Sequence, residues 1–383
     1  MTTLAPTPTG LAKLFSPIRI GTLNLANRVV MAPMTRHFAP GGVVTPDVAA
    51  YYRRRAEADV GLIVTEGAWV EHPGASNDPN IPRFYGEDAL AGWKMVLDEV
   101  HAAGGKIIPQ LWHIGLYTAA PVAGIEKPLE PLRDDQVGPS GYSGTIGVMP
   151  TLQGRPMTQR DVDDVIEAFA RGAKSAFDMG FDGIAIHGAH GYLIDQFFWD
   201  ETNRREDSYG GDLAARTAFA TEMVSEMRRR TAPDFPIMFR FSQWKLQNYG
   251  ARLAQTPEAL EAFLTPLADA GIDIFDCSQR RFWEPEFEGS DLNLAGWTKK
   301  LTGKPTSTVG SVGLDQDLME ALAGASGKPA SIEKLFDRLD RDEFDLVGVG
   351  RALLVDPQWA SKAKADRIDT ALPYTPGALG KLY

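Results

Sequence analysis

Short apolar runs alternate with amphipathic segments along most of this chain. Each run is at most eight residues long and rich in β-compatible residues, and most are followed by apolar positions at helical spacing. Strands that alternate with helices predict βαβ units and a parallel sheet. Eight such units make an α/β fold of the (β/α)8 TIM-barrel type. The predicted strands are residues 28–35, 60–67, 106–112, 181–188, 236–242, 272–278, 304–311 and 344–351.

The helix that precedes the fourth strand has the clearest end signals. Thr158 and Asp161 resemble a capping box, and Gly180 is a typical residue at a helix C-terminus. Thr256 followed by Pro257 predicts a second helix start, with proline at the first helical position. The first helix should lay one apolar stripe on the barrel, formed by Val162, Val165, Ile166, Phe169, Ala173, Ala176 and Phe177.

The chain is longer than a barrel needs. A (β/α)8 barrel takes about 250 residues, and this chain has 383. Residues 14–25 alternate around a Gly-Thr turn and predict a hairpin that plugs the N-terminal end of the barrel. Residues 114–156 predict an excursion after the third strand, and residues 279–300 predict a long aromatic loop that acts as a lid or binding loop. Without internal repeats, the economical prediction is one domain over residues 1–383.

Composition narrows the possible partners. A net charge of −11 argues against nucleic acid and anionic membrane surfaces, and it suits a protein that binds a small molecule. The single cysteine, Cys277, excludes an internal disulfide and a cysteine-ligated cluster. We find neither an apolar leader nor an uninterrupted spanning segment, so we expect a cytoplasmic protein.

Reactive side chains follow the fourth predicted strand. His187, His190 and Tyr192 stand within six residues at its carboxyl end, which is where chemistry takes place in this kind of barrel. Two imidazoles that donate hydrogen bonds and a phenol that gives a proton suit a substrate that develops charge on an oxygen. Three such groups on one short segment indicate an active site.

The last two strands predict a phosphate site. Loops after the seventh and eighth strands form the recurrent phosphate-binding region of these barrels, where backbone amides and an arginine act together. Here they carry Gly310, Ser311, Gly350 and Arg351. A phosphorylated cofactor is therefore expected.

Some polar residues at the strand ends suit a purely structural role. Taken singly, Gln110 and Arg240 are better explained as structural groups, and so is Glu66. His187 and His190 could also bind zinc, but a catalytic zinc usually needs three protein ligands. No HExxH motif, HxH pair or matching carboxylate accompanies them, so no metal is predicted.

With these residues assembled, the chain resembles the Old Yellow Enzyme family of flavin-dependent ene-reductases. The resemblance extends from LFSPIRIGTLNLANRVVMAPMTR to VGVGRALLVDPQW, and the segment HGAHGYLIDQFFWDETNRREDSYGG carries it most specifically. It implies tightly but non-covalently bound FMN, with NAD(P)H as a transient hydride donor. The implied reaction delivers hydride to the β-carbon of an α,β-unsaturated carbonyl or nitro compound, and Tyr192 protonates the α-carbon.

The resemblance also implies which residues meet the flavin. Thr35 would lie near O4 of the isoalloxazine, and Arg240 would lie beside N1 and O2, where reduced flavin is negative. The full set of implied cofactor contacts is Pro33, Met34, Thr35, Gly67, Gln110, Arg240, Gly310, Ser311, Gly350 and Arg351.

On the substrate side, His187 and His190 match the pair that holds the carbonyl oxygen in the family. Trp112, Phe282 and Trp283 are expected to line the substrate pocket. The segments QWKLQNYGARL and RRFWEPEFEGSDLNLAGW are not universal in the family, so the physiological alkene stays open. The choice between NADH and NADPH, and between monomer and homo-oligomer, stays open too. Two other classes remain: a metal-dependent barrel hydrolase, and a barrel that binds flavin without turnover.

Overall fold

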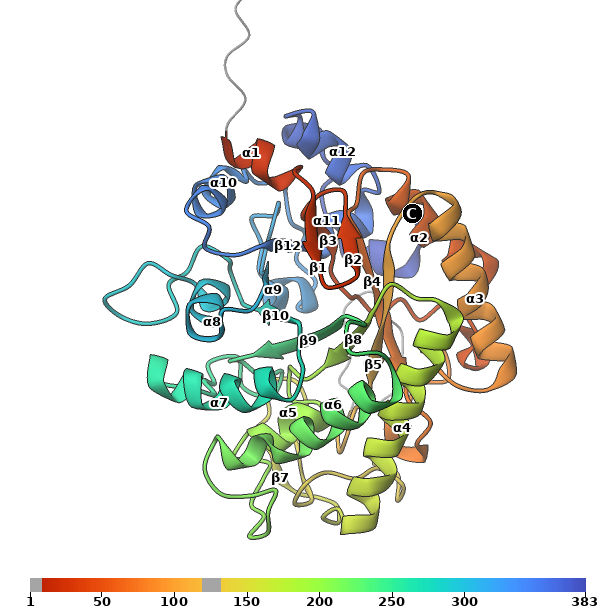
Figure 1. The fold of residues 1–383 in the computed structure, drawn as a ribbon, viewed down its shortest axis with the longest axis vertical. Coiled ribbons are helices and arrows are strands. Elements are labelled where there is room, and N and C mark those ends of the chain that lie inside the picture. Colours follow the sequence, from red (N-terminus) through yellow and green to blue (C-terminus); the bar gives the residue numbers. More distant parts are fainter. Residues whose placement is uncertain (1–8, 119–131) are drawn as a thin grey trace, which may run out of the picture.

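Eight parallel strands close into a barrel (Figure 1). The computed structural model describes residues 9–118 and 132–383. Neighbouring barrel strands follow chain order, and β12 pairs with β3 to close the ring. The barrel strands are β3 (Val29–Met31), β4 (Leu62–Trp69), β5 (Ile107–Trp112), β8 (Ile184–His187), β9 (Ile237–Ser242), β10 (Ile274–Ser278), β11 (Thr306–Val309) and β12 (Leu346–Val349). The predicted (β/α)8 barrel and its eight strands are confirmed.

Several ladders are shorter than the predicted runs. β3 ends at Met31 and β12 ends at Val349. Pro33 has no N–H to donate, so the first strand cannot extend its ladder through that position. Residues 33–35 therefore lie in the connection above the barrel, and Gly350 and Arg351 lie where β12 passes into α11 (Arg351–Val355); all five line the cavity at that end.

Helices surround the barrel on its outside (Figure 1). They are α1 (Thr9–Leu14), α2 (Pro46–Ala56), α3 (Glu87–Ala102), α4 (Gln159–Met179), α5 (Leu193–Phe198), α6 (Ala218–Arg230), α7 (Pro257–Asp269), α8 (Leu294–Thr302), α9 (Leu318–Leu322), α10 (Glu333–Asp340), α11 (Arg351–Val355) and α12 (Trp359–Lys364).

The helix ends follow the sequence signals. Thr158 and Asp161 form both hydrogen bonds of the capping box of α4, and Gly180 ends the helix in the left-handed conformation. Thr256 caps α7 by accepting a hydrogen bond from the Ala259 amide. Both predicted helix starts are confirmed.

The predicted N-terminal hairpin also forms. β1 (Ile18–Ile20) and β2 (Leu23–Leu25) pair antiparallel. Ile20, Leu23 and Leu25 are buried in one apolar cluster with inward-facing barrel residues such as Leu62 and Ile274. The hairpin closes the end of the barrel opposite the carboxyl ends of its strands.

The two long connections predicted from the sequence, residues 114–156 and 279–300, agree with the structure to different extents. In the excursion, β6 (Tyr142–Ser143) and β7 (Thr151–Leu152) pair antiparallel, while residues 119–131 lie outside the described residues. The prediction of a loop over 279–300 is wrong in its second half, because α8 begins at Leu294. Asn293 caps that helix by accepting from the Gly296 amide, so the connection is residues 279–293.

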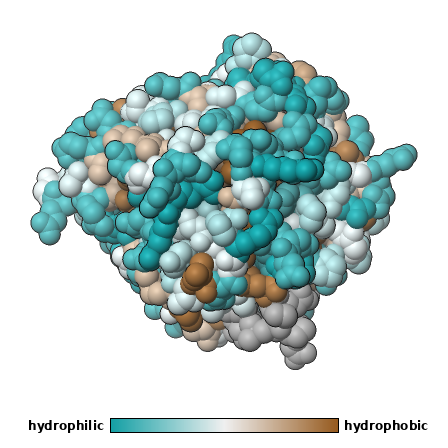
Figure 2. All heavy atoms as spheres, turned by 90° about the horizontal axis from the view of Figure 1, so that it is seen from below, coloured by the Kyte–Doolittle hydropathy of each residue, from teal (hydrophilic) through white to brown (hydrophobic). Residues whose placement is uncertain are grey.

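The surface face in Figure 2 is mainly hydrophilic, and its brown apolar areas are small. The most exposed large apolar side chains include Val148, Met149 and Leu152, all in the excursion. Among residues 9–118 and 132–383, no helix combines the length and apolar content needed to cross a membrane.

Candidate active site

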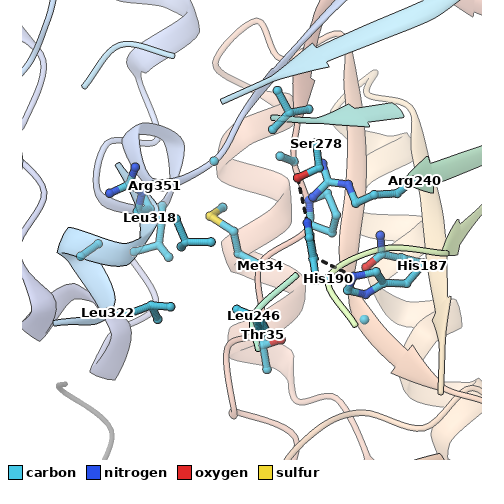
Figure 3. Close-up of a pocket in the computed structure, with 18 of the residues that line it drawn as sticks. Met34, Thr35, His187, His190, Arg240, Leu246, Ser278, Leu318, Leu322 and Arg351 are labelled. Atoms are coloured by element: carbon cyan, nitrogen blue, oxygen red, sulfur yellow. Dashed lines mark hydrogen bonds between the residues drawn. The ribbon is translucent and has the colours of Figure 1, made fainter. Parts of the chain in front are cut away.

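A cavity of about 400 Å³ opens at the carboxyl ends of the barrel strands. Every one of the ten residues predicted to contact the cofactor lines it, and so do the predicted catalytic residues and Trp112. In Figure 3, Arg351 lies on one side of the pocket and the pair His187 and His190 on the other, with Met34 between them. The fold thus brings together groups from almost the whole length of the chain, while their individual roles stay predictions.

His187 and His190 contact each other directly. Nε2 of His187 lies 3.0 Å from Nδ1 of His190, and Nε2 of His190 lies 2.8 Å from Oγ of Ser278. Burial, with the positive charge of Arg240, lowers the pKa of His187 to about 3. Burial, with His187, Arg240 and Lys245, holds the pKa of His190 well below its ordinary value. Both imidazoles are therefore neutral at pH 7, and each carries one N–H.

The turn that carries His190 is held in an unusual backbone conformation. His190 has a φ of +69°, in the left-handed region that residues other than Gly seldom adopt, although Asn, Asp and His do so more often than the rest. Its amide donates to Oγ of Ser242 at 3.1 Å, and the next amide, of Gly191, donates to Asp195 at 2.7 Å. Asp195 in turn forms a fully buried ion pair with Lys245. These contacts from α5 and from the connection after β9 offset the cost of the strained turn.

Tyr192 lies beside the histidines in an aromatic environment. Its ring centroid is 5.1 Å from that of His187, 5.0 Å from that of Trp112 and 5.2 Å from that of Tyr117. Burial raises the pKa of Tyr192 above its ordinary value of 10.0. The phenol is therefore protonated across the physiological range and can act as an acid.

Three buried donors on the cavity wall have no hydrogen-bond acceptor among the described residues. They are Nε2 of Gln110, Nη2 of Arg240 and Nε1 of Trp112. The other side of the Arg240 guanidinium is fixed, since its Nε donates to Asp276 at 2.6 Å. A buried donor without an acceptor costs about 1–3 kcal/mol. The wall is thus prepared for a ligand that presents several acceptor atoms.

The opposite end of the cavity is formed by backbone and by one arginine. A Cβ at Gly310 would come within 2.9 Å of the Gln279 carbonyl oxygen, so a side chain there would press on backbone. Ser311, with a φ of +50°, turns the chain toward Gln316 and donates to its carbonyl at 3.0 Å. Arg351 spans the loops after β11 and β12 by donating to the carbonyls of Gln316 and Asp317 at 2.7 and 2.8 Å. The arginine therefore also organises this end of the cavity.

Two predicted substrate-pocket residues do not line the cavity. Phe282 is buried behind Gly310, with its backbone amide donating to the Gly310 carbonyl, and it packs edge-on against Trp283. The Trp283 carbonyl accepts from Arg338, and Lys334 lies over the Trp283 ring. At Phe282 and Trp283 the connection folds outward over α10, so the structure does not bring these two residues to the cavity, although Gln279 and Arg280 of the same connection line it.

Several further residues of the cavity wall were not singled out from the sequence. Ser278 ends β10, so the strand-end rule applied to the other strands would have found it. Trp244, which stacks on His190 with centroids 4.4 Å apart, lies in a connection and carries no periodic signal. Tyr117 and Leu246 join Trp112 and Trp244 in one apolar cluster over the histidines. This cluster makes the walls of the cavity around Tyr192 mainly apolar.

The described residues offer no ready metal site. Within 9–118 and 132–383, no group of three or more His, Cys, Asp or Glu side chains is arranged to hold a metal ion. The one cysteine, Cys277, is buried in β10.

Comparison with known families gives a match over nearly the whole chain. The NADH:flavin oxidoreductase / NADH oxidase family matches residues 13–370. A protein named NADH oxidase from Thermoanaerobacter brockii is 34% identical over 363 residues, which is 92% of this chain and 51% of that protein. 12-Oxophytodienoate reductase 7 from Oryza sativa subsp. japonica is 40% identical over 221 residues, which is 56% of this chain and 54% of that protein. The chain spans about half the length of these curated relatives.

Solved structures share the fold. Morphinone reductase in complex with tetrahydroNAD matches with a TM-score of 0.74 and 25% identity over 96% of this chain and 93% of that chain. An Old Yellow Enzyme homologue from Zymomonas mobilis matches with a TM-score of 0.71 and 24% identity over 92% and 93%; at that identity the likeness is one of fold.

Proposed function

The chain belongs to the NADH:flavin oxidoreductase / NADH oxidase family, that of the Old Yellow Enzymes, and on this premise we propose that it is an FMN-dependent ene-reductase. The proposed reaction consumes NAD(P)H and a proton and saturates the C=C bond of an α,β-unsaturated carbonyl or nitro compound. The observation that carries the proposal is the grouping of His187, His190 and Tyr192 on a cavity whose remaining wall suits a flavin.

The residues present fit FMN. Unpartnered buried donors at Gln110 and Arg240 suit the carbonyl and ring-nitrogen acceptors of an isoalloxazine. Arg240 also supplies a fixed positive charge for the negative charge of a reduced flavin. At the other end, the small residues Gly310, Ser311 and Gly350 line the cavity together with Arg351, and this set suits a phosphate. When bound, FMN supplies hydride transfer in both directions, from the nicotinamide and to the alkene.

The two histidines hold the substrate's activating oxygen. Because both are neutral and buried, each offers an N–H without a full charge. Hydrogen bonds from them draw electron density from the alkene and stabilise the enolate-like oxygen that forms as the β-carbon gains hydride. In a cavity with mainly apolar walls these bonds are stronger than they would be in water.

Tyr192 completes the reaction by protonating the α-carbon. The hydroxyl proton of Tyr192 is transferred to the α-carbon, and the π electrons of the enolate C=C bond form the new C–H bond. Solvent then reprotonates the phenolate. The raised pKa keeps the proton in place until a carbanion is available. Trp112 and Tyr117, packed edge-on against the ring, fix its position.

The visible spectrum of the purified protein tests this function directly. We expect a yellow protein that bleaches on anaerobic addition of NADPH or NADH and regains its colour on addition of 2-cyclohexenone. A protein that stays colourless after FMN is supplied would contradict the flavoenzyme proposal. A yellow protein that bleaches but is not reoxidised by enones or nitroalkenes would contradict the ene-reductase activity alone.

A further inference from the structure

His190 is bonded at both ring nitrogens, which restricts where its proton can reside. Nδ1 lies 3.0 Å from Nε2 of His187, and Nε2 lies 2.8 Å from Oγ of Ser278 (Figure 3). A neutral imidazole has one donor and one acceptor nitrogen. Donation can therefore run from Ser278 through His190 to His187, or in the opposite direction. The two directions place the His190 proton on different nitrogens.

The two directions of donation differ in whether the Ser278 hydroxyl proton finds an acceptor. Among the described residues the Ser278 hydroxyl has no hydrogen-bond partner other than His190, and Ser278 is buried. If His190 donated to Ser278, the hydroxyl proton would have no acceptor among the described residues and would point into the mainly apolar cavity that Ser278 lines, which costs about 1–3 kcal/mol at a buried site. If Ser278 donates to His190 Nε2, the hydroxyl is satisfied and the imidazole proton stays on Nδ1.

The second arrangement is the one that makes His190 a donor at Nδ1 in the proposed reaction. A substrate oxygen that replaces the direct contact between the two histidines meets Nδ1 of His190 and Nε2 of His187, and His187 donates to it when its own proton is on Nε2. A protonated Nδ1 donates a hydrogen bond to the substrate oxygen. An unprotonated Nδ1 instead presents a lone pair, which repels that oxygen. We propose that Ser278 is a positioning residue that holds the proton of His190 on Nδ1 and so makes this histidine a donor to the substrate's activating oxygen. This inference rests on the proposed ene-reductase function and concerns the same site.

The surroundings keep Ser278 and His190 in this alignment. Trp244 stacks on the His190 ring at an interplanar angle of 24°, and its Nε1 donates to the backbone carbonyl of Ser278 at 3.1 Å. One tryptophan thus fixes the plane of the imidazole and the strand end that carries the hydroxyl. Ser242 is the register partner of Ser278 on β9, and it accepts from the backbone amide of His190 without contacting the ring. It is therefore a matched control.

Nitrogen-15 NMR of the flavin-loaded protein with labelled histidine tests the proposal. The chain has six histidines, and His190→Asn identifies the resonances of His190. In the wild type we expect a protonated Nδ1 and an unprotonated, hydrogen-bonded Nε2. In Ser278→Ala we expect the proton to be shared between both nitrogens. Ser278→Thr should restore the wild-type spectrum, and Ser242→Ala should not change the nitrogen that carries the proton.

Kinetics supply a second readout. In Ser278→Ala, KM for 2-cyclohexenone should rise about ten-fold, as expected for loss of one hydrogen bond, while reduction of the flavin by NADPH is unchanged. A proton on Nε2 in the wild type, or an Nδ1 proton retained in Ser278→Ala, would overturn the role of Ser278 even if the enzyme reduces enones. If the spectra agree with our expectation but the wild type does not reduce enones, the proposed function fails and the tautomer assignment stands.

Discussion

Lys245 and Asp195 form an ion pair with no exposed side-chain surface, with Nζ 2.6 Å from Oδ1. They lie 50 positions apart in the chain and meet directly behind the histidine turn. Lys245 also donates to the Ser242 carbonyl, and Asp195 accepts from the Gly191 amide. The pair thus connects α5 to the connection after β9 and holds the backbone of His190 from both sides.

Breaking this pair on one side should destabilise the protein strongly. Lys245→Met leaves Asp195 buried without its counter-ion, and we expect a loss of about 3–5 kcal/mol in the free energy of unfolding. The double variant with Asp195→Asn removes both charges and keeps an acceptor for Gly191, so most of the loss should be recovered. Urea titration of the three proteins measures both effects. Equal destabilisation of the single and double variants would show that the unpaired charge is not the cause.

Removal of the Tyr192 hydroxyl should separate the two halves of the reaction. In Tyr192→Phe, reoxidation of the flavin by 2-cyclohexenone should slow about 10²–10⁴-fold, the usual contribution of general acid catalysis. Reduction by NADPH should be unchanged, because that half needs no proton from Tyr192. Anaerobic stopped-flow absorbance follows each half separately. Tyr117→Phe is the matched comparison, and a larger loss there would move the proton-donor role to Tyr117.

The unpartnered amide of Gln110 should contribute to flavin affinity. Gln110→Leu removes a buried donor of the cavity wall, and we expect the dissociation constant of FMN to rise about ten-fold for one lost hydrogen bond. Fluorescence titration of the apoprotein with FMN measures this change. Urea unfolding of the apoprotein serves as the control, since Gln110 Nε2 bonds to no other described residue and stability without flavin should not decrease. Unchanged FMN affinity would place the isoalloxazine away from Gln110.

Acid should destabilise the protein partly through His187. Burial lowers the pKa of His187 from 6.5 to about 3 in the folded protein. Between these values the unfolded chain binds a proton that the folded protein does not, so stability falls as the pH drops from about 6.5 toward 3. One such group lowers the free energy of unfolding by at most about 1.4 kcal/mol per pH unit. In His187→Gln the loss between pH 7 and pH 4.5 should be smaller, which urea titrations at several pH values can measure. If the free energy of unfolding falls equally with pH in the wild type and in His187→Gln, His187 is not a source of the acid destabilisation.

The sequence determined the barrel and the position of its site. Apolar runs such as residues 181–188 alternate with helices that carry their own end signals at Thr158 and Gly180, because burial on both faces and helix capping leave local patterns. Once eight parallel strands are expected, the strand-end rule places His187, Arg240 and Arg351 around one cavity, as observed. The family resemblance then added a cofactor and a reaction to this arrangement.

Tertiary structure alone decided how the site is held together. Whether Phe282 turns toward the cavity or behind Gly310 depends on the path of a connection, which has no periodicity to read. The ion pair of Lys245 with Asp195 and the contact of His190 with Ser278 join residues 50 and 88 positions apart. Such contacts depend on barrel register and on the burial of polar groups that must find partners in three dimensions. Local sequence therefore fixed which groups reach the mouth of the barrel, and long-range packing fixed their orientation, protonation and partners.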